Sequence, residues 1–181
     1  LIQSIGVIGA DNPGTAGSNL ATLQAVPGVL SAAFGGPPLW GVDRISLFDS
    51  ADAQQPLAQA YVFAGSQGLN RTLGVRIVEG RDIQDAELPG VAELAGDPAT
   101  TPSASRQMPA LLTAPLAGKL FPGQSAIGQI LHANIFGTPV SLRVVGVMAP
   151  VRAAITGRAE DADAVLTEFR VAGEGLGGGY M

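Results

Sequence analysis

The sequence predicts an α+β fold in two parts, a strand-helix-strand unit followed by a mostly β part with short helices. Apolar and polar residues alternate at the period of a strand in several runs, whereas the helical spacing recurs in short stretches. The run Gly-Gly-Pro-Pro at residues 35–38 is the clearest break in the chain. We therefore expect a first part at residues 1–36, a second part at residues 37–172 and a flexible, glycine-rich tail at residues 173–181.

The first part is predicted from one helix between two strands. We expect a strand that ends near residues 7–8, a helix that begins after Ser18 and a second strand at residues 29–34. Ser18 is a favoured N-cap, and Pro27-Gly28 stops the helix. The simplest product is a parallel pair of strands covered by one helix.

The second part begins with two runs, residues 43–48 and 58–64, that alternate at strand period on either side of a polar link. They are expected to pair as an antiparallel ribbon. Residues 69–73 form a link or a helical turn. Residues 75–78 are strand-like, and Arg76 is expected to face away from the apolar side chains.

The middle of the chain predicts a short apolar strand at residues 109–112 and a brief helix after it. Thr113 is a favoured N-cap, and Pro115 lies in the first turn, where its missing N–H costs nothing. Pro122-Gly123 must end the helix. Its apolar face is formed by leucines at a spacing of four: Leu112, Leu116 and Leu120.

Three further segments complete the second part. Residues 127–131 and 140–148 are expected to form a hairpin through a bend that contains Gly137. Residues 164–171 alternate as one more strand. Residues 84–107 have no firm period, and we interpret them as a mobile surface loop rather than a functional one.

Composition excludes several function classes. With 46% hydrophobic and 14% charged residues the chain is not a disordered acidic tail. A net charge of -5 and a single lysine, Lys119, argue against a surface that tracks nucleic-acid phosphates. Without cysteine there is no disulfide, thiol nucleophile or thiolate metal site. No apolar run approaches the ~20 residues that span a bilayer, and no signal peptide precedes Leu1, so we interpret the chain as a domain excised from a longer protein.

Candidate chemical groups are few. Residues 173–178 match the spacing G-x-G-x-x-G, but the chain ends before any helix that would hold a pyrophosphate. His132 is the only histidine, which excludes a zinc site built on two histidines, and we expect it at the surface or on a strand edge. Residues 70–72 form a glycosylation sequon, which carries no information without a known secretory route.

Acidic residues gather in two clusters, one at Asp82, Asp85 and Glu87 and the other at Glu160, Asp161 and Asp163. Neither has the spacing of a calcium loop, so we interpret both as solvated turns. An apolar cluster near the proposed boundary includes Phe34, Leu39 and Trp40. It is either core packing or an exposed patch that docks a partner.

Three stretches carry a resemblance to a known family. The first joins residues 120–123 (Leu-Phe-Pro-Gly) to Ile127-Gly128 and residues 143–147 (Arg-Val-Val-Gly-Val). The others are residues 23–32, a helix that passes through Pro-Gly-Val into a strand, and residues 73–82, which end in Gly-Arg-Asp. In this order the three resemble the extracytoplasmic core domain of MacB-like ABC-transporter permeases, a group related to the FtsX and LolC permeases.

The resemblance implies a place and a set of partners. The domain would lie on the periplasmic side of the bacterial cytoplasmic membrane, with residues 1–36 as a porter unit near the membrane and residues 37–172 as an inserted distal subdomain. A second porter unit is expected to follow, and it is missing or truncated here. Implied partners are the membrane helices of the permease, a cytoplasmic ATPase subunit or domain, a second permease copy and a periplasmic adaptor or lipoprotein. Neither nucleic acid nor a cofactor is implied.

The implied function is mechanical and not catalytic: the domain would transmit ATP-driven motion to substrate export or to periplasmic partners. Phe34, Leu39 and Trp40 would then lie near a contact between parts or subunits. Two alternatives remain open, a free-standing extracytoplasmic ligand-binding or sensory domain and an acid-dependent hydrolase. The first needs a closed pocket with convergent polar groups, and the second needs two facing carboxylates in a cleft.

Overall fold

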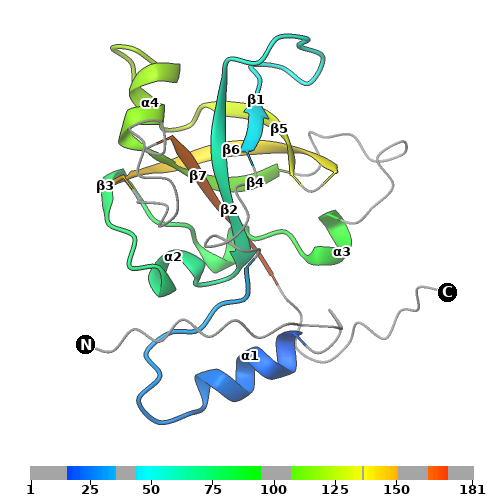
Figure 1. The fold of residues 1–181 in the computed structure, drawn as a ribbon, viewed down its shortest axis with the longest axis vertical. Coiled ribbons are helices and arrows are strands. Elements are labelled where there is room, and N and C mark those ends of the chain that lie inside the picture. The colour runs from blue at the N-terminus through cyan, green and yellow to red at the C-terminus, as the bar shows by residue number, and fades with distance from the viewer. Residues whose placement is uncertain (1–15, 36–43, 95–106, 136, 151–162, 171–181) are drawn as a thin grey trace, which may run out of the picture.

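The computed structural model describes residues 16–35, 44–94, 107–135, 137–150 and 163–170 (Figure 1). Helices and strands follow one another in the order α1 (Ala16–Gln24), β1 (Arg44–Leu47), β2 (Ala58–Ser66), α2 (Leu69–Thr72), β3 (Ile77–Gly80), the 3-10 turn η2 (Asp85–Glu87), α3 (Val91–Leu94), β4 (Gln107–Thr113), α4 (Ala114–Leu120), β5 (Ile130–Ile135), β6 (Thr138–Met148) and β7 (Ala164–Phe169). The α+β class and the short helices of the mostly β part are confirmed.

The strands form one mixed sheet in the order β1-β2-β7-β4-β6-β3, and β5 also pairs with β6. The predicted ribbon is confirmed, because β1 pairs antiparallel with β2. The predicted hairpin is confirmed as β5 and β6, and Gly137 in its turn has a φ of 86°, which favours glycine. The central strand β7 lies parallel to β2 and antiparallel to β4.

A bridge between Phe48 and His132 closes this sheet into a barrel. The Phe48 N–H donates to the His132 carbonyl and the His132 N–H donates to the Phe48 carbonyl, each over 2.9 Å. Phe48 follows β1 at one end of the strand order, and His132 belongs to β5, which lies beyond β6 at the other end. The six strands β1, β2, β7, β4, β6 and β5 therefore form a closed ring. The strand-edge position predicted for His132 is wrong, because this half-buried residue pairs with Ser141 of β6 on one side and with Phe48 on the other.

The inside of the barrel is an apolar core. Alternate residues of each strand point inward, as the period of two requires. Leu116 of α4 packs into the same core and is fully buried, and Leu120 is partly buried against it. The predicted helical face is confirmed for these two leucines, whereas Leu112 belongs to β4. The largest fully buried side chains of this core are Leu47, Met108, Leu112, Leu116, Leu131, Leu142 and Val140. Each buried leucine contributes roughly 2 kcal/mol of hydrophobic stabilisation.

A second apolar layer covers the outer face of β7, β4 and β6. Leu69 of α2, Ile83 and Leu88 pack there against Leu111 and Leu166. Because both faces of β7 are covered, residues 164–168 are all buried. The alternating strand predicted here exists, but it is a central strand with no solvent face.

The strand predicted at residues 29–34 is wrong. These residues form no strand, and only the neighbouring Gly35 makes an isolated bridge, to Gly65. Only Phe34, at the end of this segment, contacts a described strand, at Ser66 of β2, and Leu30 is 93% exposed. The predicted helix is confirmed as α1, but it begins at Ala16, so the N-cap predicted at Ser18 is wrong. The strand expected near residues 7–8 lies outside the described residues.

The mobile loop predicted from residue 84 is also wrong for its first half. Residues 85–87 form η2, Leu88 is buried in the outer layer, and Gly90 bridges to Arg170. The apolar anchor Leu88 holds this segment against the barrel, although its surroundings in the sequence are polar. The rest of the predicted loop up to residue 106 and the glycine-rich tail lie outside the described residues.

Candidate functional site

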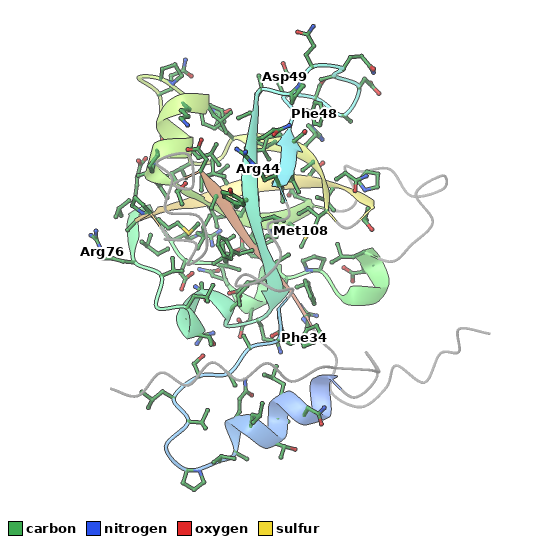
Figure 2. The ribbon with its side chains drawn as sticks, in the orientation of Figure 1. Phe34, Arg44, Phe48, Asp49, Arg76 and Met108 are labelled. Carbon is green, nitrogen blue, oxygen red and sulfur yellow. The ribbon has the colours of Figure 1, made fainter. Side chains whose placement is uncertain are left out.

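The α1 segment, residues 16–35, meets the barrel at one end, where β2 and β7 both finish. These parallel strands place Gly65 opposite Glu168 and Ser66 opposite Phe169. Figure 2 shows Phe34 between the barrel and α1. We name this contact the junction and define it as residues 31–35, 65–72 and 168–169.

The first contact of the junction is the close approach of the backbone at Phe34 to the end of β2. The Phe34 N–H donates to Ser66 Oγ over 2.8 Å, and the Ser66 N–H donates to the Phe34 carbonyl over 2.6 Å. A Cβ atom on Gly65 would lie 2.5 Å from the Phe34 carbonyl oxygen. Only glycine at position 65 allows the backbones to approach this closely.

The second contact is a buried carboxylate at the end of β7. Glu168 is 2% exposed, and its two carboxylate oxygens accept the N–H groups of Gly68 over 3.0 Å and of Asn70 over 2.9 Å. Burial raises the pKa of Glu168 above its ordinary value, the two amide hydrogen bonds oppose this, and Asp82 adds to the rise. The carboxylate fastens the start of α2 to β7.

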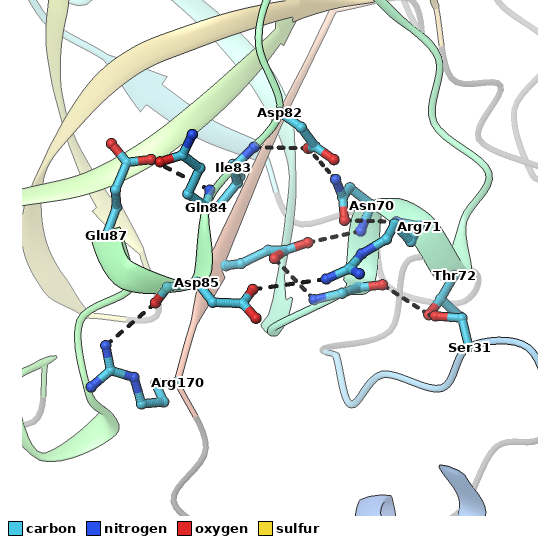
Figure 3. Close-up of polar contacts among 12 residues, drawn as sticks. Ser31, Asn70, Arg71, Thr72, Asp82, Ile83, Gln84, Asp85, Glu87 and Arg170 are labelled. Carbon is cyan, nitrogen blue, oxygen red and sulfur yellow. Dashed lines mark hydrogen bonds and ion pairs between the residues drawn. The ribbon is translucent and has the colours of Figure 1, made fainter.

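Asn70 extends this network to the segment after β3 (Figure 3). Its side-chain amide donates to the carboxylate of Asp82, which also accepts the Ile83 N–H over 2.8 Å. The side-chain carbonyl oxygen of Asn70 accepts the Arg71 N–H over 2.7 Å. Since Asn70 is 4% exposed and its amide is occupied, the sequon at residues 70–72 is not an accessible glycosylation acceptor in this structure.

The third contact joins α2 to the α1 segment. Thr72 Oγ1 donates to the Gly68 carbonyl over 2.9 Å and lies 2.7 Å from Ser31 Oγ, as Figure 3 shows. Beside this contact is an open crevice of about 450 Å³. Its lining comes from both sides of the junction: Gln24, Val29, Leu30, Ser31, Ala32, Gln67, Gly68, Arg71 and Asp85.

A cluster of arginines surrounds Glu87 above the junction. Arg81 donates to both carboxylate oxygens of Glu87, over 2.7 and 2.6 Å, and Arg143 donates to one of them over 2.8 Å. The hydrogen bond from Arg81 lowers the pKa of Glu87. Arg170 donates to the carbonyls of Asp85 and Leu88. This cluster holds η2 onto the barrel.

The acidic residues therefore differ from the solvated turns that the sequence predicts. That prediction is wrong for Glu87, which binds two arginines, and for Asp82, which binds Asn70. It holds for Asp85, whose side chain is 70% exposed. In the second cluster Asp163 is buried and pairs with Lys119, while Glu160 and Asp161 lie outside the described residues.

Comparisons with known proteins show which solved structures share this fold. No family model and no curated protein matches the chain. The crystal structure of the extracellular domain of the ABC-type transporter YknZ from Gram-positive bacteria matches 87% of the chain, with a TM-score of 0.50 and 18% identity. The chain has the fold of that extracellular domain. It spans 65% of the YknZ domain's length, and the fold expected from the MacB-like resemblance is confirmed.

Two further solved structures are similar at lower TM-scores. The periplasmic region of MacB from Actinobacillus actinomycetemcomitans matches 90% of this chain and 58% of its own, at 12% identity and a TM-score of 0.48. A domain of a permease protein from Porphyromonas gingivalis matches 82% and 54%, at 18% identity and a TM-score of 0.45.

The residues expected at an interface are only partly placed. Phe34 lies in the junction and is 37% exposed, whereas Leu39 and Trp40 lie outside the described residues. Sequence reasoning missed Glu168. The available signal was an acid inside a strand-like run with no other charge, Val-Leu-Thr-Glu-Phe at residues 165–169.

The described residues contain neither a cluster of metal ligands nor a helix that could cross a membrane. No group of three or more histidine, cysteine or acidic side chains in the described ranges is close enough to hold a metal ion. His132 instead lies 3.2 Å from Ser141 Oγ through its Nδ1 atom. No helix in the described part of the chain is long and apolar enough to cross a membrane.

Proposed function

We propose that this chain is an extracytoplasmic domain of an ABC-transporter permease and that it transmits ATP-driven motion without catalysing a reaction itself. The observation that carries the proposal is the match of 87% of the chain to the extracellular domain of YknZ. The low sequence identity makes this a likeness of fold, so the activity of the whole transporter is part of the proposal.

The junction supports a mechanical role. A domain inserted between two membrane helices receives force where its chain enters and leaves. In this structure the α1 segment, which precedes the barrel, and β7, the last described strand, meet at the same end of the barrel. Segment 66–72 binds both of them, through Phe34 and Ser31 on one side and Glu168 on the other. A displacement of either would therefore be passed to the barrel through this segment.

The barrel is suited to act as a rigid lever. Its strands form a closed ring, and a filled apolar core leaves little room for the strands to slide. The proposed partners are the membrane helices of the permease, a cytoplasmic ATPase, a second permease copy and a periplasmic adaptor or lipoprotein. We propose that Phe34, Leu39 and Trp40 lie near a contact between the parts of the domain or between two permease copies. Self-association of a Trp40→Ala variant tests this contact, and unchanged association contradicts it.

The junction can be locked to test the mechanical role. Because the chain has no cysteine, the pair Ser31→Cys and Thr72→Cys introduces a defined cross-link where two side-chain oxygens are 2.7 Å apart. In the full-length permease with its ATPase, oxidation of this pair is expected to reduce coupled transport at least severalfold, and a reductant should restore it. The matched control is Phe48→Cys with His132→Cys, which cross-links positions that already pair within the barrel. Equal activity of the locked and reduced junction would overturn the mechanical role.

The encoding reading frame separates the competing classes. Apolar spans of ~20 residues on both sides of the domain support a permease. A secretory signal alone would reject it and favour a free-standing ligand-binding or sensory domain.

A further inference from the structure

Glu168 is a buried acid that the proposed function does not by itself require. In the described residues no lysine or arginine forms an ion pair with it, and its hydrogen-bond donors are the amides of Gly68 and Asn70. Burying an ionised carboxylate without a paired cation is costly, and two amide donors offset only part of that cost. A strand position so deeply buried would be filled more favourably by an apolar side chain if it served packing alone.

The charged groups that face Glu168 do not remove this cost. Asp82, on the segment after β3, repels the carboxylate, and Arg71 of α2 attracts it. Arg71 is directed to solvent, with 65% of its side chain exposed, and its carboxylate partner is Asp85 over 3.8 Å. The carboxylate of Glu168 is therefore more stable in water than in its present site.

The two amides that hold Glu168 belong to the turn that binds the α1 segment. Gly68 and Asn70 begin α2, and Thr72 in the same turn contacts Ser31. The crevice of about 450 Å³ reaches Gly68 and Arg71, so water and space are available beside the turn. An outward movement of residues 67–72 would hydrate Glu168 and break the contact between Thr72 and Ser31 together, while the contact between Phe34 and Ser66 of β2 would remain.

We propose that Glu168 forms a proton-sensitive latch, which holds residues 67–72 closed against β7 and frees Ser31 of the α1 segment when the turn opens and the carboxylate becomes hydrated. This inference rests on the proposed function, because it names the regulation of the junction through which force would pass. The latch closes more firmly when Glu168 is protonated.

The direction of the pH effect follows from linkage. Burial raises the pKa of Glu168 in the closed state, whereas the open, hydrated state has a value near the ordinary 4.5. The closed state therefore binds a proton more readily than the open state, so closure is favoured as the pH falls through this window. As the pH rises through the raised pKa this contribution is lost, and the junction opens more easily.

Glutamine at position 168 cannot accept both amide N–H groups that the Glu168 carboxylate accepts. In the variant Glu168→Gln the single side-chain oxygen would accept one amide, and the NH₂ group would face the second amide donor. The variant therefore loses one of the two hydrogen bonds and also loses the titrating group. It should open more often than the wild type at acidic pH and show no dependence on pH.

Amide hydrogen exchange on the 181-residue chain tests the latch. Rates between pH 5 and 8, corrected for intrinsic exchange, give the protection of residues 67–75 and 29–35. Within the titration window protection is expected to rise by up to tenfold for each unit that the pH is lowered. Glu168→Gln should flatten this dependence, and Glu87→Gln, which changes a carboxylate outside the junction, should leave it unchanged.

A second variant guards against a failure of Glu168→Gln to fold. Asp82→Asn removes the repelling charge but keeps an oxygen that accepts the Ile83 N–H, so the midpoint of the protection curve should shift to lower pH. Protection that is independent of pH in the wild type, or a dependence that persists unchanged in Glu168→Gln, would overturn the latch. These measurements need no transport, whereas the cysteine cross-link tests the proposed function separately.

Discussion

Substitution of Gly65 by alanine is expected to detach or destabilise the α1 segment. The new Cβ would lie 2.5 Å from the Phe34 carbonyl oxygen and 3.0 Å from both Gly35 Cα and Leu69 Cδ2, whereas an ordinary contact begins at 3.4 Å. The Phe34 backbone must therefore retreat by about 0.9 Å, judged from these distances. That displacement weakens the pair of hydrogen bonds between Phe34 and Ser66.

Two contributions set the magnitude of this effect. Two hydrogen bonds that are each worth about 1 kcal/mol are lost or stretched, and overpacking at a close contact adds about 1–3 kcal/mol. We expect Gly65→Ala to lower the free energy of unfolding by about 3–5 kcal/mol in total, provided that the α1 segment unfolds with the barrel. If the segment detaches by itself, the barrel keeps its stability and residues 26–35 become sensitive to protease.

Urea unfolding followed by circular dichroism, together with limited proteolysis, distinguishes these two results. The matched control is Gly118→Ala in α4, where a Cβ would meet no atom within 4 Å. That change should stabilise the chain by about 0.5–1 kcal/mol, because alanine favours a helix over glycine. The reasoning is refuted if Gly65→Ala leaves both the unfolding midpoint and the cleavage of residues 26–35 unchanged.

Three further predictions concern the barrel and its polar contacts. Thr113→Val should cost about 1–3 kcal/mol in unfolding free energy, because Thr113 Oγ1 accepts the buried Ala164 N–H over 3.0 Å, and Thr113→Ser should recover most of the loss. Leu112→Ala should cost about 3 kcal/mol in urea unfolding, since Leu112 is fully buried in the barrel core, whereas Ile130→Ala at a side chain that is 45% exposed should cost under about 1 kcal/mol. The hydrogen bond from Arg81 lowers the pKa of Glu87, so the stability from its arginine pairs is present above the ordinary pKa of 4.5 and is lost as the pH falls through the pKa of the folded state. Glu87→Gln should therefore flatten the pH dependence of the unfolding midpoint between pH 2 and 6. An unaltered profile would contradict this.

The sequence by itself determined most of the local structure of the barrel. The alternation in residues 43–48 and 58–64 predicts β1 and β2, and Pro122-Gly123 predicts the end of α4. These signals are local: side-chain direction alternates along any strand, and a proline or a glycine ends a helix through its own backbone. Arg76 is likewise expected to face away from the apolar side chains, and Figure 2 shows it directed away from the barrel.

The sequence also misled where a local pattern lacked a partner. Residues 29–34 have the composition of a strand, but a strand requires a neighbour along its length to accept its hydrogen bonds. Among the described strands, only the end of β2 meets this segment, at Phe34. The opposite error occurs at Leu88. This single apolar residue in a polar segment finds a place in the outer layer and holds η2 in position.

Only the tertiary structure decided how distant segments meet. The parallel pairing of β2 with β7 joins residues that are about a hundred positions apart, and no local pattern specifies which strand lies beside which. That pairing brings Glu168 to the amides of Gly68 and Asn70 and brings Gly65 against Phe34. The period of two in the sequence determined where the strands are. The junction depends on the pairing of β2 with β7, which buries β7 on both faces and brings Glu168, near the end of β7, to the segment that binds the α1 segment.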